Sequence, residues 1–155
     1  MVENKLSIST PSELVRFTPD KIVYIEAQGN YSEFVQVDGK KNMLVIQLGK
    51  IAAAIEDQLD ADENMFVRIG KSYIVNSNYI YQIKVQKKEL VLSDMATFSI
   101  TLSPSREALR NLKQLMDELI RSISHEQRTP IKETLSNLKQ SVDELIRSIS
   151  HEQQV

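Results

Sequence analysis

Residues 66–76, FVRIGKSYIVN, decide how most of this chain has to be interpreted. Two runs of β-branched and aromatic residues stand on either side of Gly-Lys-Ser, a pattern typical of antiparallel strands joined by a tight turn. Residues 24–31, YIEAQGNY, repeat the arrangement around a Gly-Asn turn. The two stretches predict a sheet whose turns carry small polar and basic residues.

Short runs of the same kind continue from residue 14 to residue 102, separated by Gly, Asn and Asp. This spacing predicts antiparallel strands joined by hairpins. One amphipathic helix is predicted at residues 50–59, because apolar residues recur there three and four positions apart. The fold class predicted for this part is therefore mainly β with one short helix. The predicted strands are residues 14–17, 21–27, 31–37, 42–48, 65–69, 73–76, 79–85, 89–93 and 97–102.

After residue 102 the apolar period becomes that of a helix. Ser103-Pro104 and Thr129-Pro130 are each predicted to be an N-cap followed by proline at the first helical position. Residues 111–127 recur almost unchanged as residues 137–153. The sequence thus predicts a β-rich domain at residues 1–106 and a helical extension with an internal repeat at residues 107–155.

Both copies of the repeat carry apolar residues at alternating spacings of three and four, which gives two helices with matching apolar faces. Each face needs a partner. A helical hairpin, a bundle of two hairpins from two chains, one long helix kinked at Pro130, and a duplication without function are all compatible with the pattern. The interpretation carried forward is a homodimer through the C-terminal helices, a coiled-coil or bundle contact. Its predicted oligomerisation residues are Leu112, Met116, Leu119, Ile123, Leu138, Val142, Leu145 and Ile149.

Composition excludes several function classes. The absence of cysteine removes disulfides, thiolate nucleophiles and cysteine-ligated zinc. The two histidines, His125 and His151, occupy equivalent repeat positions without metal-ligand spacing, and the glycines stand singly rather than in a phosphate-binding loop. We therefore predict no enzyme activity, no metal site and no cofactor. No signal pattern or membrane-spanning apolar run is present, so a soluble cytoplasmic protein is expected.

The charge balance requires that any contact with nucleic acid be local. The formal net charge is −2, and residues 1–110 contain thirteen Lys and Arg against fourteen Asp and Glu. Three basic clusters stand out, and the first two are equally typical of solvated hairpin turns. They are Lys40 with Lys41, Lys84 with Lys87 and Lys88, and Arg68 with Lys71.

The two stretches quoted above resemble the signature segments of the LytTR family of bacterial DNA-binding domains, and the resemblance extends over residues 11–106. It implies a β-rich domain that presents loops to successive major grooves on one face of double-stranded DNA, and so a sequence-specific transcriptional regulator. Relatives usually carry a receiver domain or membrane segments ahead of this module. With so few residues before its first predicted strand, this chain is expected not to receive a phosphoryl signal by itself.

The resemblance assigns DNA contacts to three segments. Alternatives remain for three of the residues: Asn30 could be a turn residue with left-handed φ, Arg68 a cross-strand ion-pair partner, and Arg106 simply a first-turn helix residue. The implied contacts are Asn30 and Ser32 in the first segment, Arg68, Lys71 and Ser72 in the second, and Ser105 and Arg106 in the third.

Two further positions bear on this assignment. Many family members carry histidine where this chain has Gly70, so one base contact is missing here. Asn76 is predicted to be structural, because an Asn that ends a strand satisfies backbone groups in the turn that follows. The alternative function is a protein-interaction module that has lost its DNA contacts and works through the paired helices.

Overall fold

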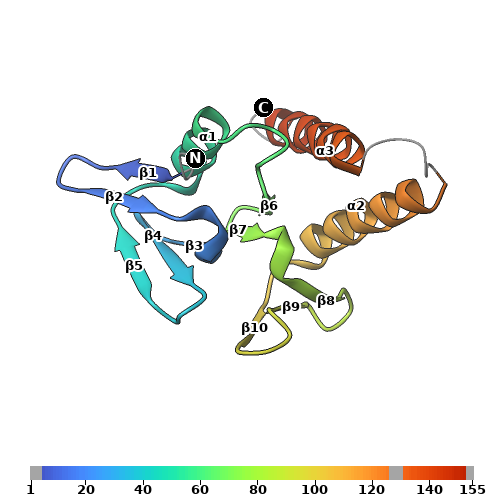
Figure 1. The fold of residues 1–155 in the computed structure, drawn as a ribbon, viewed down its shortest axis with the longest axis horizontal. Coiled ribbons are helices and arrows are strands. Elements are labelled where there is room, and N and C mark those ends of the chain that lie inside the picture. Colours follow the sequence, from blue (N-terminus) through green and yellow to red (C-terminus); the bar gives the residue numbers. More distant parts are fainter. Residues whose placement is uncertain (1–4, 126–130, 153–155) are drawn as a thin grey trace. The chain divides into compact units, whose positions relative to one another are not determined.

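The computed structural model describes residues 5–125 and 131–152 (Figure 1). It divides into two units, Met1–Leu109 and Arg110–Val155, and each is described by itself. The first unit is built of antiparallel strands with one short helix, and two long helices follow, which confirms the predicted mainly β fold with a C-terminal helical extension.

A five-stranded antiparallel sheet forms the centre of the first unit, with strand order β5-β4-β3-β7-β6. Its middle strand, β3, is buried at its first four residues, and because successive residues of a strand point to opposite faces, the sheet is covered on both faces there. The strands are β3 (Ile22–Gln28), β4 (Tyr31–Gln36), β5 (Lys41–Leu44), β6 (Phe66–Ile69) and β7 (Tyr73–Asn76).

One cover is a helix, α1 (Leu48–Gln58), together with a hairpin of β1 (Leu6–Ser9) and β2 (Leu14–Phe17). The side chain of Gln58 holds α1 to β1, since it accepts the N–H of Ser7 and donates to the Ser7 carbonyl, both at 2.8 Å. The sequence analysis missed β1. Its alternation of two apolar residues with two serines is too short to predict a strand without the partner strand that pairs with it.

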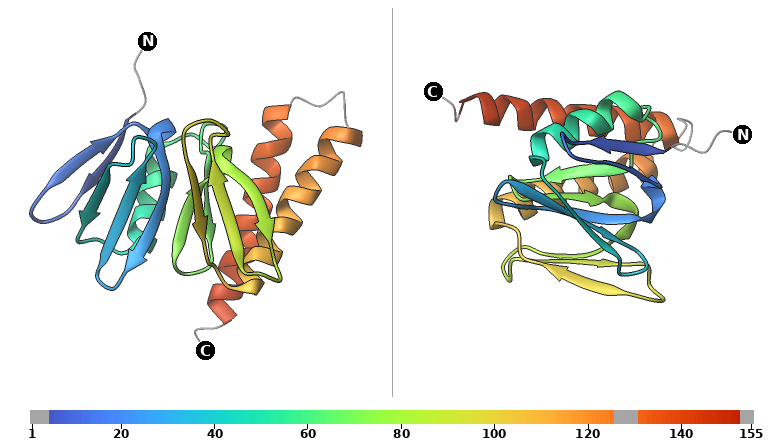
Figure 2. Two further views of the ribbon diagram at one scale, coloured as in Figure 1. Left: turned by 90° about the horizontal axis from the view of Figure 1, so that it is seen from below. Right: turned by 90° about the vertical axis from the view of Figure 1, so that its left-hand side faces the viewer.

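A second, three-stranded sheet has the order β10-β9-β8 and follows β7 through the short 3₁₀ helix η2 (Ser77–Tyr79). Asn76 makes this connection: its side chain donates to the Ile22 carbonyl at 3.0 Å and accepts the N–H of Asn78 at 3.0 Å. The predicted structural role of Asn76 is thereby confirmed. The strands are β8 (Ile80–Lys84), β9 (Glu89–Ser93) and β10 (Ser99–Leu102), shown from two further directions in Figure 2.

Three predicted boundaries were wrong. The strand predicted at 42–48 ends at Leu44, because Leu48 is already the first residue of α1. The strand predicted at 97–102 begins at Ser99, because Asp94 accepts the N–H groups of Thr97 and Phe98 and keeps them in the preceding turn. The predicted N-cap Ser103 is replaced by Ser105, whose hydroxyl accepts the N–H of Ala108 at 3.1 Å.

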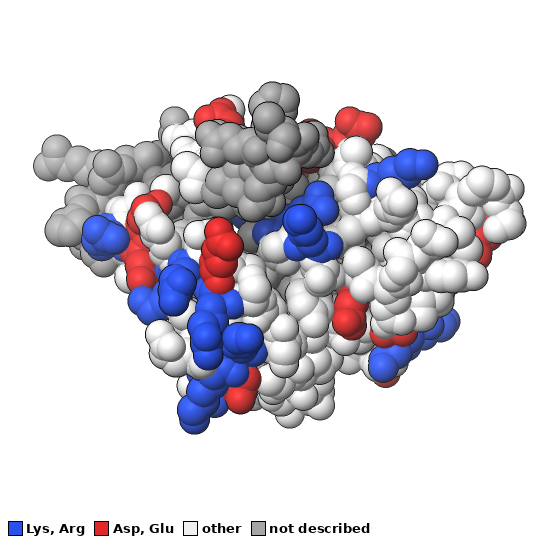
Figure 3. Space-filling view, turned by 180° about the vertical axis from the view of Figure 1, so that it is seen from behind, with Lys and Arg blue, Asp and Glu red and all other residues white. Residues whose placement is uncertain are grey.

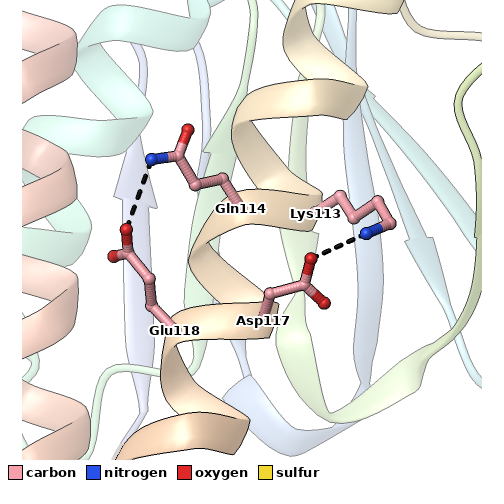
Figure 4. Close-up of polar contacts among 4 residues, drawn as sticks. All are labelled: Lys113, Gln114, Asp117 and Glu118. Atoms are coloured by element: carbon pink, nitrogen blue, oxygen red, sulfur yellow. Dashed lines mark hydrogen bonds and ion pairs between the residues drawn. The ribbon is translucent and has the colours of Figure 1, made fainter.

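The long helices are α2 (Arg106–His125) and α3 (Ile131–Glu152). Two side-chain pairs four residues apart, shown in Figure 4, join successive turns of α2: Lys113 with Asp117 at 2.7 Å, and Gln114 with Glu118 at 3.3 Å. Such exposed pairs add a few tenths of a kcal/mol each, about 0.2–0.5. No helix within the described ranges is long and apolar enough to cross a membrane. The predicted cap Thr129-Pro130 lies outside the described residues.

Candidate nucleic-acid interface

The register of the five-stranded sheet brings the first two predicted segments to the same edge. Gln28 at the end of β3 pairs with Tyr31 at the start of β4, so the turn between them is Gly29-Asn30. Ile69 pairs with Tyr73 across β6 and β7, which leaves Gly70, Lys71 and Ser72 as the second turn. Because β3 and β7 are antiparallel neighbours, the end of β3 lies beside the start of β7.

The first turn is shaped by its glycine. Gly29 has φ of +63°, whereas Asn30 is not among the residues with positive φ. A glycine with positive φ at the first central position of a two-residue hairpin turn is the pattern of a type II′ turn. The alternative in which Asn30 supplies the left-handed φ of this turn is therefore wrong. Asn30 is exposed.

The second turn is tied directly to β3, because the Ser72 carbonyl accepts the N–H of Ala27 at 2.8 Å. Gly70 has φ of +61°, and a Cβ built on it would lie 3.4 Å from the Cβ of Ala108. A side chain at position 70 would thus meet both backbone strain and the first turns of α2. Lys71 and Ser72 are exposed.

The third segment reaches the same edge. Burial first, and then the nearby Glu26 carboxylate, raise the pKa of Tyr73 above its ordinary value of 10.0, against the opposing effect of the Ser103 backbone, which contacts the Tyr73 hydroxyl and lowers this pKa. Ser105 and Arg106, which follow at once, are exposed. We call this end of the strands the Asn30 edge. It consists of the turns at 29–30 and 70–72 and the segment 103–106.

Comparison with protein-family models identifies the family of this chain. The family model of the LytTr DNA-binding domain matches residues 12–117. The chain belongs to the LytTR family of DNA-binding domains.

Among solved structures, the LytTR fold of this chain is similar to the LytTr DNA-binding domain of a Bacillus cereus protein described as a methyl-accepting/DNA response regulator. The TM-score is 0.50 and the sequence identity is 17%, with 74% of this chain and 98% of the other covered. A comparison with curated protein sequences gives no match. At this identity the structural likeness concerns the fold alone.

Within the LytTR domain, Ser32 faces the interior. Its side chain is 0% exposed, and its hydroxyl donates to the Ile46 carbonyl at 2.8 Å. Strand alternation could have revealed this, because Ser32 shares a face with the buried Phe34 whereas Tyr31 points outward and is 47% exposed. Tyr31, which sequence reasoning did not select as a contact, stands beside Asn30 at the edge.

Arg68 lies on β6, the edge strand of the LytTR sheet, opposite Ile74. Its Nε is buried and has no hydrogen-bond partner in the described part of the chain, and none of the described carboxylates forms an ion pair with it. The alternative in which Arg68 is a cross-strand ion-pair partner is therefore wrong. The guanidinium retains donors for a ligand.

Two carboxylates lie on the strands that the first turn joins. Glu26 and Glu33 are directly opposite each other on β3 and β4. Burial first, and then these two carboxylates, raise the pKa of Tyr24 above its ordinary value, and Tyr24 contacts Tyr73 edge-on at 6.5 Å between ring centroids. In the described residues no group of three or more His, Cys, Asp or Glu is placed to hold a metal ion.

Proposed function

We propose that this chain is a sequence-specific transcriptional regulator that inserts the turns of its Asn30 edge into the major groove of double-stranded DNA. The observation that carries the proposal is the convergence of three segments, far apart in the sequence, on one edge of a LytTR fold. Membership of a DNA-binding family supports the choice of ligand.

Each proposed contact follows from the chemistry of its side chain. Asn30 both donates and accepts, which suits the edge of an adenine. Lys71 and the Ser72 hydroxyl suit phosphate oxygens, and Gly70 lets the backbone approach closely. Arg106 can bind guanine through two parallel hydrogen bonds.

Three other predicted residues take different places. The Ser105 hydroxyl already accepts an N–H as the cap of α2, so we propose that it positions Arg106 and contacts phosphate only as a donor. Arg68 is proposed as a phosphate contact from the edge strand through the terminal nitrogens of its guanidinium, because its Nε is buried. Ser32 is left out, because its hydroxyl is buried and donates to the Ile46 carbonyl in the connection between β5 and α1.

Selection of the full chain against a randomised duplex library tests the proposal. We expect a defined motif. Lys71→Ala should weaken binding to all duplexes and reduce the log–log salt slope by about 0.9, whereas Arg106→Ala should relax specificity at one base pair at a cost of about 1–3 kcal/mol. Lys41→Ala is the matched control, because Lys41 starts β5 at the opposite end of the sheet. Absence of a motif, or equal binding by all three variants, would contradict the proposal.

We further propose that the C-terminal helices join two copies of the chain. Two of the predicted oligomerisation residues, Ile123 on α2 and Leu145 on α3, are 44% and 59% exposed, and exposed apolar side chains of this kind favour a contact surface. Of the other predicted oligomerisation residues, Leu112 is buried, Met116, Leu119, Leu138 and Val142 are half-buried, and the side chain of Ile149 lies outside the described part.

Sedimentation velocity tests the dimer. Leu145→Asp should convert dimer to monomer, whereas Gln140→Asp, an exposed position on another side of α3, should not. A monomeric unmodified chain would refute this part of the proposal. Self-association without any DNA binding would instead favour the interaction module, for which the exposed apolar residues are the supporting observation.

A further inference from the structure

The turn between β8 and β9, residues 85–88, carries two lysines that the proposed DNA contacts do not use. The N–H of Lys88 donates to the Val85 carbonyl at 3.1 Å and closes a tight turn. Lys84 forms an ion pair with Glu89 at 3.6 Å, directly across the hairpin. Lys87 and Lys88 are exposed, and neither forms an ion pair with any described residue.

The register of the second sheet places this turn at the Asn30 edge. Leu102 at the end of β10 pairs with Leu90 near the start of β9, and Lys84 at the end of β8 pairs with Glu89. The turn at 85–88 therefore extends beyond the strands on the side where Ser103 contacts Tyr73. At the other end, the Tyr79 hydroxyl donates to the Asp20 carbonyl at 2.7 Å, close to the start of β3, so both ends of the two sheets are aligned.

The surface over this hairpin is basic. Figure 3, seen from behind, shows Lys and Arg side chains gathered at its lower left with a few Asp and Glu among them; this corresponds to the lower right of Figure 1, where β8 and β9 lie. Because the whole chain has a net charge of −2, such a cluster gives this face a local positive potential that the chain lacks on average.

The backbone of Lys88 is the second observation. Its φ is +54°, in the left-handed region that glycine or asparagine normally occupies in a hairpin turn. The β4–β5 turn uses Gly39, with φ of +85°, for the same purpose. A lysine in this conformation costs conformational free energy that a glycine would avoid, so local turn chemistry does not explain why this position carries a lysine.

We propose that the β8–β9 turn is a further DNA contact, in which Lys87 and Lys88 bind backbone phosphates flanking those reached by the two turns and the 103–106 segment of the Asn30 edge. This inference rests on the proposed function. Lysine presents a compact charge without the planar fork that reads a base edge, so the contact should add affinity without adding sequence preference. It should also add to the salt dependence of binding.

The test compares two double variants of the full chain that each remove two hairpin lysines. Lys87→Gln with Lys88→Gln should lower the log–log salt slope by about 1.8, on both the selected operator and a scrambled duplex. Lys40→Gln with Lys41→Gln makes the same change in net charge at the opposite end of the sheet and should leave the slope unchanged. Equal slopes for the two double variants would overturn the proposal.

The outcomes separate this inference from the proposed function. An operator that the unmodified chain selects, together with an unchanged slope in the Lys87 and Lys88 variant, would reject the hairpin contact alone. A reduced slope without any selected motif would support the hairpin contact and reject sequence specificity. If the unmodified chain binds no duplex, both are rejected.

A single variant sharpens the result and controls for folding. Lys88→Gly removes the charge and relieves the strained backbone, so it should melt at a higher temperature and yet bind DNA more weakly. Met95→Gly is its match, because Met95 also has positive φ, +64°, but lies in the β9–β10 loop at the opposite end. Met95→Gly should gain stability with DNA affinity unchanged, and an unchanged affinity in Lys88→Gly as well would overturn the proposal.

Discussion

The β4–β5 and β8–β9 hairpins both end in lysine-bearing turns, and they differ in how the backbone of the turn is accommodated. In the β4–β5 turn, Gly39 takes the positive φ and the Asp38 carboxylate accepts the N–H of Lys40 at 2.9 Å. In the β8–β9 turn a lysine takes that conformation itself. Local turn chemistry accounts fully for the first hairpin but not for the second, and the two turns point to opposite ends of the strands.

Of the substitutions that test this comparison, Gly39→Ala is expected to change the stability most. No atom lies within 4 Å of the added Cβ, so the cost is that of the left-handed backbone alone, about 1–2 kcal/mol of unfolding free energy. Urea unfolding measures it. Gly49→Ala in α1, where the Cβ also meets open space, should instead stabilise by about 0.5–1 kcal/mol. A loss of equal size in both variants would show that Gly39 is not held for its conformation.

A third turn, between β9 and β10, is held by a carboxylate and responds to pH. The Thr97 hydroxyl and the N–H groups of Ala96, Thr97 and Phe98 donate to Asp94 and hold its pKa well below the ordinary 3.8. Because the folded-state pKa is depressed, the stabilisation is complete at neutral pH. It is lost as the pH falls below about 3.8 toward the folded-state value.

Asp94→Asn should therefore be less stable than the unmodified chain at neutral pH, with a difference that shrinks in acid. Urea midpoints on either side of pH 3.8 measure this. Asp38→Asn changes the acceptor of only one N–H group in the β4–β5 turn. Its free energy of unfolding should therefore fall less at neutral pH than that of Asp94→Asn. If the stability difference between Asp94→Asn and the unmodified chain did not change with pH, the role of the Asp94 charge would be contradicted.

The smallest effect concerns the carboxylates behind the Asn30 edge. Glu33→Gln removes the repulsion between Glu33 and Glu26 across β3 and β4 and should stabilise by about 0.3 kcal/mol. Glu89→Gln, which breaks the ion pair with Lys84, should shift stability in the opposite direction. Thermal melts measure the stability of both variants. Destabilisation by Glu33→Gln would contradict a net repulsion between Glu26 and Glu33.

Sequence reasoning succeeded where the information is local. Gly29 and Gly70 marked the turns correctly, since a positive φ is a property of the residue itself. It failed for β1, whose four residues become a strand only through β2 and the side chain of Gln58. It also placed the cap of α2 at Ser103 rather than Ser105, because both serines fit the local pattern, and only the hydrogen bond from Ala108 to Ser105 distinguishes them.

The candidate interface divides in the same way. The residue types at the turns were visible in the sequence, including Asn30, Lys71 and Arg106. The inward direction of Ser32 follows from strand alternation with Phe34 and was overlooked. The unpaired Nε of Arg68 could not be recognised, because it depends on neighbouring segments that the sequence does not specify.

By itself, the sequence determined the strand runs, the glycine turns, the helical repeat and the LytTR membership of this protein. Only the tertiary structure decided which turns share an edge. Strand periodicity specifies the two faces of each strand but not its neighbours, and the pairing of β3 with β7 joins residues almost fifty positions apart. That pairing, with the contact between Ser103 and Tyr73, gathers the Asn30, Lys71 and Arg106 segments at one edge and leaves Lys40 and Lys41 at the other.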